Sequence, residues 1–144
     1  MKKPKTSTKN VVNRRARFDY ELGEELTAGM SLRGVEVRAV RDGRVSLKGA
    51  FITLRNGRKG PELWLNNASF SLKNQGEGLS KSDAIDTSPK KLLATRKQIE
   101  DFARQKQAGF TIVPLKILAE NRYIKIVIAL GKGKKQYDKR ETLK

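Results

Sequence analysis

The chain has 144 residues, with 32 Lys and Arg against 15 Asp and Glu, which gives a formal net charge of +17. It contains no cysteine and no histidine, which excludes disulfides, thiolate metal sites and nucleophile–histidine pairs. Such a charge favours a polyanionic partner: nucleic acid, an anionic membrane or an acidic protein. A membrane fits least well, because the apolar run at residues 126–130 is far shorter than a membrane-spanning helix.

The first third of the chain predicts short elements. Residues 18–22 and 30–32 are expected to form two strands around a turn at Ala28 and Gly29. Residues 35–41 alternate like a strand, but glycines bracket them as they would a short helix. The pattern leaves strand and helix open for this segment.

The middle of the chain predicts a β-hairpin. Residues 46–54 alternate apolar and polar side chains and lead into Asn56-Gly57, a strong turn signal. Residues 62–70 are the expected partner strand. The intervening residues 58–61 predict a connection longer than a two-residue turn.

Residues 71–90 are rich in Ser, Gly, Lys and Asp and show no period, so we expect a mobile loop. Thr95 followed by Gln98 forms a capping box and predicts an amphipathic helix, with Gly109 ending it. Residues 110–119 and 123–130 are then expected to pair as strands across a short hairpin loop.

This set of elements predicts a mainly β fold. We expect a small antiparallel OB-fold-like barrel of about six or more strands, with one to three helices packed around it. Residues 1–12 are expected to be a disordered basic N-terminal arm, residues 13–131 the barrel domain, and residues 132–144 a basic C-terminal tail.

The N-terminal basic segment is the first candidate site. Arginine offers a planar fork to phosphate oxygens, and neighbouring Phe18 and Tyr20 could stack on bases. Equally, the arginines could belong to a solvated arm, and core packing is favoured for the two aromatic residues. The arginines concerned are Arg14, Arg15 and Arg17.

The C-terminal segment is the second candidate site, a glycine-jointed cationic track without the spacing of a phosphate-binding P-loop. It is either a solubilising tail or an RNA-binding one, and its charge density favours RNA. Its cations before the last residue are Lys132, Lys134, Lys135, Lys139 and Arg140.

Glu36 is the only acid that invites a catalytic interpretation. An ion-pairing or helix-capping role is favoured, because no second carboxylate lies at a telling distance in the sequence. We therefore predict no catalytic residue, no metal site and no cofactor. A nuclease or RNA-modifying enzyme using Tyr20, Glu36 and lysines remains an alternative.

Taken together, an ordered set of motifs resembles the SmpB (SsrA-binding protein) family. Single motifs are weak, but all of them follow in the family's order from residue 13 onward. They are Asn13-Arg14-Arg15-Ala16-Arg17, Asp19-Tyr20, Ala28-Gly29, Gly34-Val35-Glu36-Val37 with Arg41 and Gly43, Lys91-Leu92-Leu93, Val113-Pro114-Leu115, Lys132-Gly133-Lys134-Lys135 and Asp138-Lys139-Arg140.

The resemblance implies an RNA-binding adaptor for the rescue of stalled ribosomes by trans-translation. It implies binding to the tRNA-like domain of transfer-messenger RNA (tmRNA) and delivery to the ribosomal A site, with EF-Tu acting through alanyl-tmRNA. The tail would enter the empty messenger channel. By position, the RNA-binding residues would be Asn13, Arg14, Arg15, Arg17, Tyr20, Lys91 and Leu93, and the ribosome-directed tail would carry Lys132, Lys134, Lys135, Lys139 and Arg140.

The resemblance also implies a cytoplasmic protein, and we expect a monomer. Gly131 stands where the family usually has alanine, and we expect it to loosen the hinge into the tail. The alternative function is that of a basic ribosomal structural or assembly protein.

Overall fold

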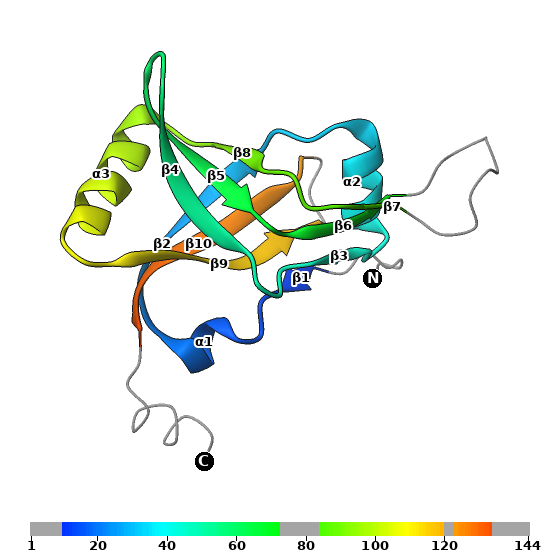
Figure 1. Cartoon of the computed structure of the whole chain (residues 1–144), viewed down its shortest axis with the longest axis horizontal. Coiled ribbons are helices and arrows are strands. Elements are labelled where there is room, and N and C mark those ends of the chain that lie inside the picture. The colour runs from blue at the N-terminus through cyan, green and yellow to red at the C-terminus, as the bar shows by residue number, and fades with distance from the viewer. Residues whose placement is uncertain (1–9, 73–83, 120–122, 134–144) are drawn as a thin grey trace, which may run out of the picture.

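The computed structural model describes residues 10–72, 84–119 and 123–133. Over these residues it contains ten strands, paired antiparallel throughout, and three helices, as Figure 1 shows. The predicted mainly β fold is confirmed. The elements are β1 (Val11–Val12), α1 (Ala16–Asp19), β2 (Tyr20–Met30), α2 (Gly34–Arg41), β3 (Val45–Ser46), β4 (Phe51–Gly57), β5 (Gly60–Asn66), β6 (Ser69–Leu72), β7 (Ala84–Asp86), β8 (Lys90–Leu93), α3 (Arg96–Gln107), β9 (Thr111–Leu118) and β10 (Lys125–Gly133).

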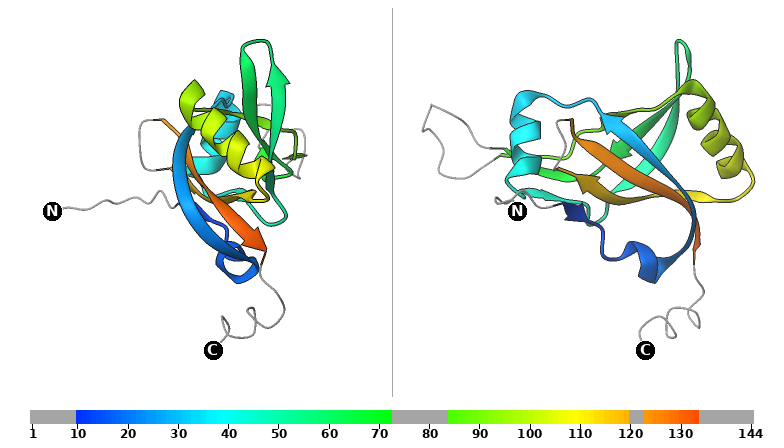
Figure 2. Two further views of the ribbon diagram at one scale, coloured as in Figure 1. Left: turned by 90° about the vertical axis from the view of Figure 1, so that its left-hand side faces the viewer. Right: turned by 180° about the vertical axis from the view of Figure 1, so that it is seen from behind.

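Seven strands form one curled sheet in the order β1-β9-β10-β2-β8-β5-β4, and β3, β6 and β7 form a second sheet. The curl brings β4 against β9, which gives the partly open barrel expected for an OB-like fold. Helix α3 packs against β5, β9 and β10 at one end, and α2 packs against β6 at the other (Figures 1 and 2).

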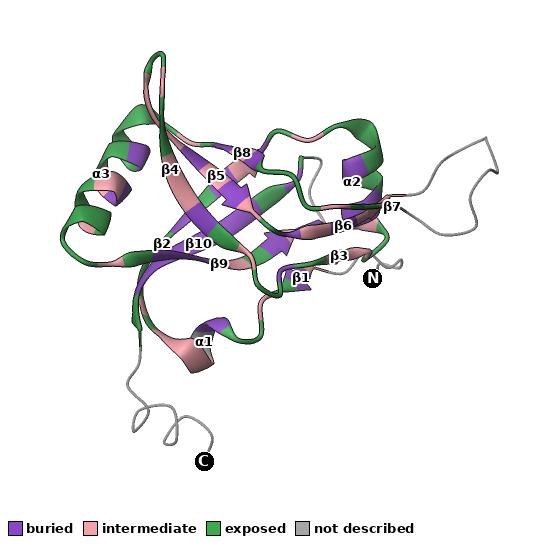
Figure 3. Cartoon of the chain, in the orientation of Figure 1, coloured by how far each residue is buried: buried purple, intermediate pink, exposed green. Residues whose placement is uncertain are grey.

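The core lies inside this curl, where β10 is the most deeply buried strand (Figure 3). Residues 126–130 of β10 are all buried because the strand pairs with β9 and β2 and is covered on both faces. Each fully buried isoleucine or leucine stabilises the fold by about 1.5–3 kcal/mol. The largest fully buried side chains include Phe70, Phe102, Leu63, Leu65, Ile117 and Ile126.

Strand β2 differs from the prediction of two short strands around a turn. It runs unbroken through Ala28 and Gly29, and residues 18–19 belong to the single-turn helix α1. The reason is pairing on both sides, since Gly29 lies opposite Lys125 of β10 and Leu93 of β8. Two ladders of backbone hydrogen bonds outweigh a local turn preference.

The segment left open between strand and helix is the helix α2. Glu36 accepts a hydrogen bond from the backbone N–H of Arg33, and the backbone N–H of Glu36 donates to the Arg33 carbonyl at the helix start. This cap supplies a partner for backbone groups that a helix end leaves unpaired.

The predicted hairpin is present, but its turn is shorter than expected. Gly57 pairs directly with Gly60, so Arg58 and Lys59 alone form the tip between β4 and β5. The turn therefore lies two residues after Asn56-Gly57, the pair that the sequence pattern favoured for it. Gly60 has a φ of +126°, a conformation that glycine adopts readily.

Both predicted strands of this region also break where the backbone turns. The first breaks near Gly49 and the second at Asn67, which have φ values of 79° and 64°. At the first break the chain passes from β3 of the small sheet to β4 of the seven-stranded one, and at the second it passes from β5 back to β6 of the small sheet.

The predicted loop at residues 71–90 is too long. Residues 73–83 lie outside the described residues, but β7 and the start of β8 fall within the predicted loop. The helix α3 and its Thr95–Gln98 capping box are confirmed, and Gly109 follows the helix with a φ of +107°. The β9–β10 pairing is confirmed, while its loop at 120–122 is outside the described part.

Strands extend into both segments assigned to basic extensions. Val11 and Val12 form β1 and pair with β9, and β10 continues through Lys132 and Gly133. Gly131 is not a hinge, because it pairs with Leu22 and a Cβ there would lie 3.2 Å from the Cβ of Tyr20. Glycine fits at position 131 because the neighbouring strand approaches closely there, and not because the backbone is flexible. None of the helices in the described ranges is long and apolar enough to cross a membrane.

Candidate RNA interface

Asn13 fixes the start of the basic segment to the barrel. Its side-chain Nδ2 donates a hydrogen bond to the Pro114 carbonyl at 2.7 Å, and its Oδ1 accepts one from the backbone N–H of Arg15 at 3.2 Å. Its backbone N–H donates to Leu115 at 2.8 Å. Asn13 therefore positions the following arginines, since its amide is already engaged within the protein.

Arg14 and Arg15 are presented to solvent at this end of the barrel. The Arg15 guanidinium lies 4.5 Å from the ring centroid of Phe18 and 3.2 Å from Asp19, yet its side chain is 65% exposed. An exposed pair of this kind contributes about 0–1 kcal/mol, so a phosphate can displace the carboxylate. Arg17 lies in α1, and its side chain is outside the described part.

A hollow of about 790 Å³ lies elsewhere on the barrel, but a second hollow of about 660 Å³ is lined by Arg15. Tyr20, Lys48 and Phe51 line this second hollow together with Arg15. Tyr20 and Phe18 are half-buried and lie outside the core cluster, so the core packing favoured for them is only partial. Cations beside open aromatic rings suit a ribonucleotide chain.

Lys48 and Phe51 were not among the sequence-predicted residues. Phe51 is 50% exposed, so its side chain is accessible at this hollow. Its place in this hollow depends on β4 curling against β9, a contact between segments about sixty residues apart that no local pattern reveals.

Lys132 joins the same end of the barrel from β10. Its neighbour Gly133 pairs with Tyr20, and its own Nζ lies 5.1 Å from the ring centroid of Phe110. The structure thus places Lys132 in a strand, opposite Glu21 at the end of β2 that follows α1. The other predicted tail residues, Lys134, Lys135, Lys139 and Arg140, lie outside the described residues.

Lys91 and Leu93 lie at the far end of β2. Leu93 is 51% exposed and pairs with Gly29, nine residues along β2 from Tyr20. At about 3.3 Å per residue, the two groups are roughly 30 Å apart along the strand. The predicted site residues therefore form two areas, an α1 end and a β8 end, which suits an extended folded RNA better than a single nucleotide.

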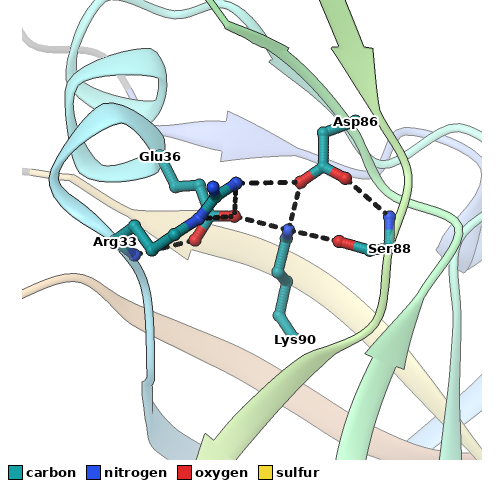
Figure 4. Close-up of polar contacts among 5 residues, drawn as sticks. All are labelled: Arg33, Glu36, Asp86, Ser88 and Lys90. Carbon is teal, nitrogen blue, oxygen red and sulfur yellow. Dashed lines mark hydrogen bonds and ion pairs between the residues drawn. The ribbon is translucent and has the colours of Figure 1, made fainter.

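A buried ion network holds β8 in place (Figure 4). The Lys90 side chain is 4% exposed; its Nζ lies 2.7 Å from Glu36 Oε2 and 2.9 Å from Ser88 Oγ, and it also contacts Asp86. Arg33 adds a bond of 2.8 Å to Glu36. The predicted ion-pairing and capping role of Glu36 is confirmed.

The network shifts the pKa of both carboxyl groups. Burial works against the charged form of Glu36, but hydrogen bonds from Arg33 and Lys90 hold its pKa below the ordinary 4.5. Burial likewise opposes the charge of Asp86, and the bonds from Lys90 and Ser88 hold its pKa well below 3.8. Because both groups prefer the ionised form in the folded protein, they stabilise it only while they stay ionised.

Acid should therefore weaken the fold through this network. The stabilisation is fully present above about pH 4.5 and is lost as the pH falls through the lowered folded-state pKa values. Urea unfolding followed by the fluorescence of the single tryptophan should show no fall from this network between pH 7 and about pH 4.5, and a fall below that pH. The Asp86→Asn variant should show a smaller fall, and an equal fall would contradict the assignment.

Comparison with known proteins agrees with this architecture. The family model described as "SmpB protein" matches residues 10–144. The SsrA-binding protein of Halalkalibacterium halodurans is 44% identical over 133 residues, covering 92% of this chain and 82% of that protein. The SsrA-binding protein of Bacillus cereus is 41% identical over 143 residues, covering 98% and 88%.

One solved structure matches the fold closely. It is described as "tmRNA-SmpB: a journey to the center of the bacterial ribosome", and its matching chain superposes with a TM-score of 0.66 at 33% identity over 94% of each chain. Sequence and fold thus agree over nearly the whole length. The chain belongs to the SmpB family of SsrA-binding proteins.

Proposed function

We propose that this protein is an RNA-binding adaptor of trans-translation that acts without catalysis. It binds the tRNA-like domain of tmRNA and helps to deliver it to the A site of a stalled ribosome. The observation that carries the proposal is the pair of cationic areas at the two ends of β2, in a chain 41–44% identical to SsrA-binding proteins. Folded RNA is recognised largely through its shape and backbone, and two areas this far apart can grip a bent ligand.

The remaining partners follow from the same role. The protein acts in the cytoplasm as a monomer, and EF-Tu reaches it only through alanyl-tmRNA. Its C-terminal residues meet the decoding site and the messenger channel. The family membership and the charge of +17 support these assignments.

Replacing Arg14 and Arg15 by alanine should weaken binding to the tRNA-like domain and flatten its salt dependence. Loss of two phosphate contacts reduces the slope of log K against log salt by about 1.4–1.8. Both side chains are exposed, so the free energy of unfolding should change by no more than about 0.5 kcal/mol. Filter binding across a salt series measures the first, and urea unfolding the second.

A matched control removes two exposed cations elsewhere, in the variant Arg38→Ala/Lys106→Ala. This control lowers the net charge by the same two units, so any change in its slope of log K against log salt reports the effect of net charge alone. We expect that change to be smaller than the change in the Arg14→Ala/Arg15→Ala variant. Wild-type protein should also prefer the tRNA-like domain over an unrelated hairpin of equal length at moderate salt. Equal affinity for the two RNAs would refute the adaptor role and favour a general ribosomal RNA-binding protein.

A further inference from the structure

The β4–β5 hairpin extends beyond the barrel as a separate cationic arm (Figure 1). Its two-residue tip is Arg58 and Lys59, both exposed, and neither makes an ion pair with the described residues. Lower on the arm, the exposed Arg55 places its guanidinium 4.5 Å from the ring centroid of Trp64. Three cations thus lie on the outer part of this hairpin, whose lower part carries the buried Ile52, Leu63 and Leu65.

A hollow of about 790 Å³ lies between this arm, β8 and the start of α3. Arg96 closes it from the helix side, and its Nη2 donates a hydrogen bond to the Lys59 carbonyl, which ties the tip to α3. The hollow has a partly apolar wall that includes Leu93. It is therefore continuous with the β8 end of the candidate interface.

The charges around this hollow are not balanced within the protein. Among its lining residues Glu62 is the single acid, and it lies 3.3 Å from Lys91, which is the partner that neutralises it. Arg96 reaches Glu100 only at 4.0 Å, with both side chains about half exposed or more. The two tip cations and Arg96 are then left facing one opening, an arrangement that costs stability unless an anion occupies it.

Arginine and lysine at an open hollow with an apolar wall suit a phosphodiester backbone. The fork of Arg58 or Arg96 can hold two phosphate oxygens, while Lys59 supplies a flexible point charge. The Arg55–Trp64 pair adds a flat stacked surface on the arm. None of these groups carries a pattern that would select particular bases, so the contact should act through charge.

We propose that the β4–β5 arm and Arg96 form a third RNA-backbone site, which extends the β8 end around Lys91 and Leu93. The site binds phosphates of the RNA that the barrel already holds. The identity of that RNA rests on the proposed function. The chemistry of the site itself requires only a chain of phosphates.

The test uses the full chain with Arg58→Ala/Lys59→Ala, which leaves the Lys59 carbonyl bonded to Arg96. Binding to the isolated tRNA-like domain should weaken about 5- to 50-fold at 0.1 M salt, with a slope lower by about 1.4–1.8. The Arg38→Ala/Lys106→Ala variant again controls for net charge. A parallel series with purified small ribosomal subunits distinguishes the tRNA-like domain from ribosomal RNA as the source of the phosphates.

The outcomes are distinct. Weaker binding to the tRNA-like domain supports the site. Weaker binding to the ribosomal subunits alone, or a wild-type slope and affinity with both RNAs, overturns it as a contact with the RNA on the barrel. If wild-type protein does not prefer the tRNA-like domain, the adaptor role fails independently of this variant. Thermal unfolding should be unchanged in Arg58→Ala/Lys59→Ala, because both residues are exposed at a hairpin tip.

Discussion

Replacing Lys90 by methionine should lower the free energy of unfolding by about 3–5 kcal/mol, because it leaves buried carboxylate charge without its main partner. Glu36 is 4% exposed and would keep only Arg33, whose side chain is 66% exposed and well hydrated. Asp86 would lose its closest cation as well. Urea unfolding at pH 7 measures the change.

Two variants make this test specific. Lys91→Met alters the neighbouring residue of the same strand, which is half-exposed and pairs with Glu62 at the surface, so its cost should stay below about 1 kcal/mol. Adding Glu36→Gln to Lys90→Met removes the stranded charge and keeps a cap acceptor for α2. The double variant should be more stable than the sum of the single changes predicts, by about 1–3 kcal/mol. Strict additivity would mean that the two charges are not coupled.

Loss of RNA binding should be larger for the Lys91 variant than for the Lys90 variant, the reverse of their order in loss of stability. Lys91 and Leu93 alternate with Lys90 and Leu92, so one pair faces outward while the other pair is buried. Lys91→Met should weaken binding to the tRNA-like domain with little loss of stability. Lys90→Met should mainly lower stability, at temperatures where the folded form still dominates.

The sequence predicted those elements whose signals are local. Helix α3 carries its own capping box and terminal glycine, and the β9–β10 pair consists of two largely apolar runs, residues 112–118 and 124–130, separated by a few mostly polar residues. These features depend on residues that are close together in the sequence. They need no knowledge of distant contacts.

Elements that depend on tertiary pairing were missed or misplaced. β2 passes through a turn-prone pair because β10 and β8 supply ladders on both sides, and β7 and the first residue of β8 lay in what resembled a polar loop. Lys90 and Lys91 are the same residue type side by side, and Lys90 is the buried one because its partners include Glu36, fifty-four residues earlier in the chain. Composition cannot tell two such lysines apart.

The candidate site shows the same division. The basic motifs were visible in the sequence, but their separation by the length of β2 and the hollow beside Phe51 were not. Residues 58–61 were recognised only as a longer connection, whereas the structure places two cations at the very tip. Which charged side chains lie together in a binding site depends on the fold, and the sequence alone does not reveal it.

Deleting residues 134–144 should abolish tagging of proteins on stalled ribosomes and spare binding to the isolated tRNA-like domain. The deletion begins after β10, so the pairing of Gly133 with Tyr20 and the placement of Lys132 over Phe110 are kept. Both ends of β2 are thus preserved, whereas a cut at residue 132 would remove part of the α1 end. In vitro translation of a stop-less message with tmRNA measures tagging, and filter binding measures RNA affinity.

A second variant tests whether charge or the segment itself is needed. Alanine at four of the five cations of this segment, Lys134, Lys135, Lys139 and Arg140, keeps its length but removes most of its positive charge. If the tail acts by contact with ribosomal RNA, this variant should fail in tagging like the deletion. Tagging by the wild-type protein should then also decrease steeply as the salt concentration rises. Loss of binding to the isolated tRNA-like domain in either variant would place the tail on tmRNA itself, and normal tagging by the deletion would refute its ribosomal role. Because the barrel carries both cationic ends of β2 without this segment, the two activities should be separable in one molecule.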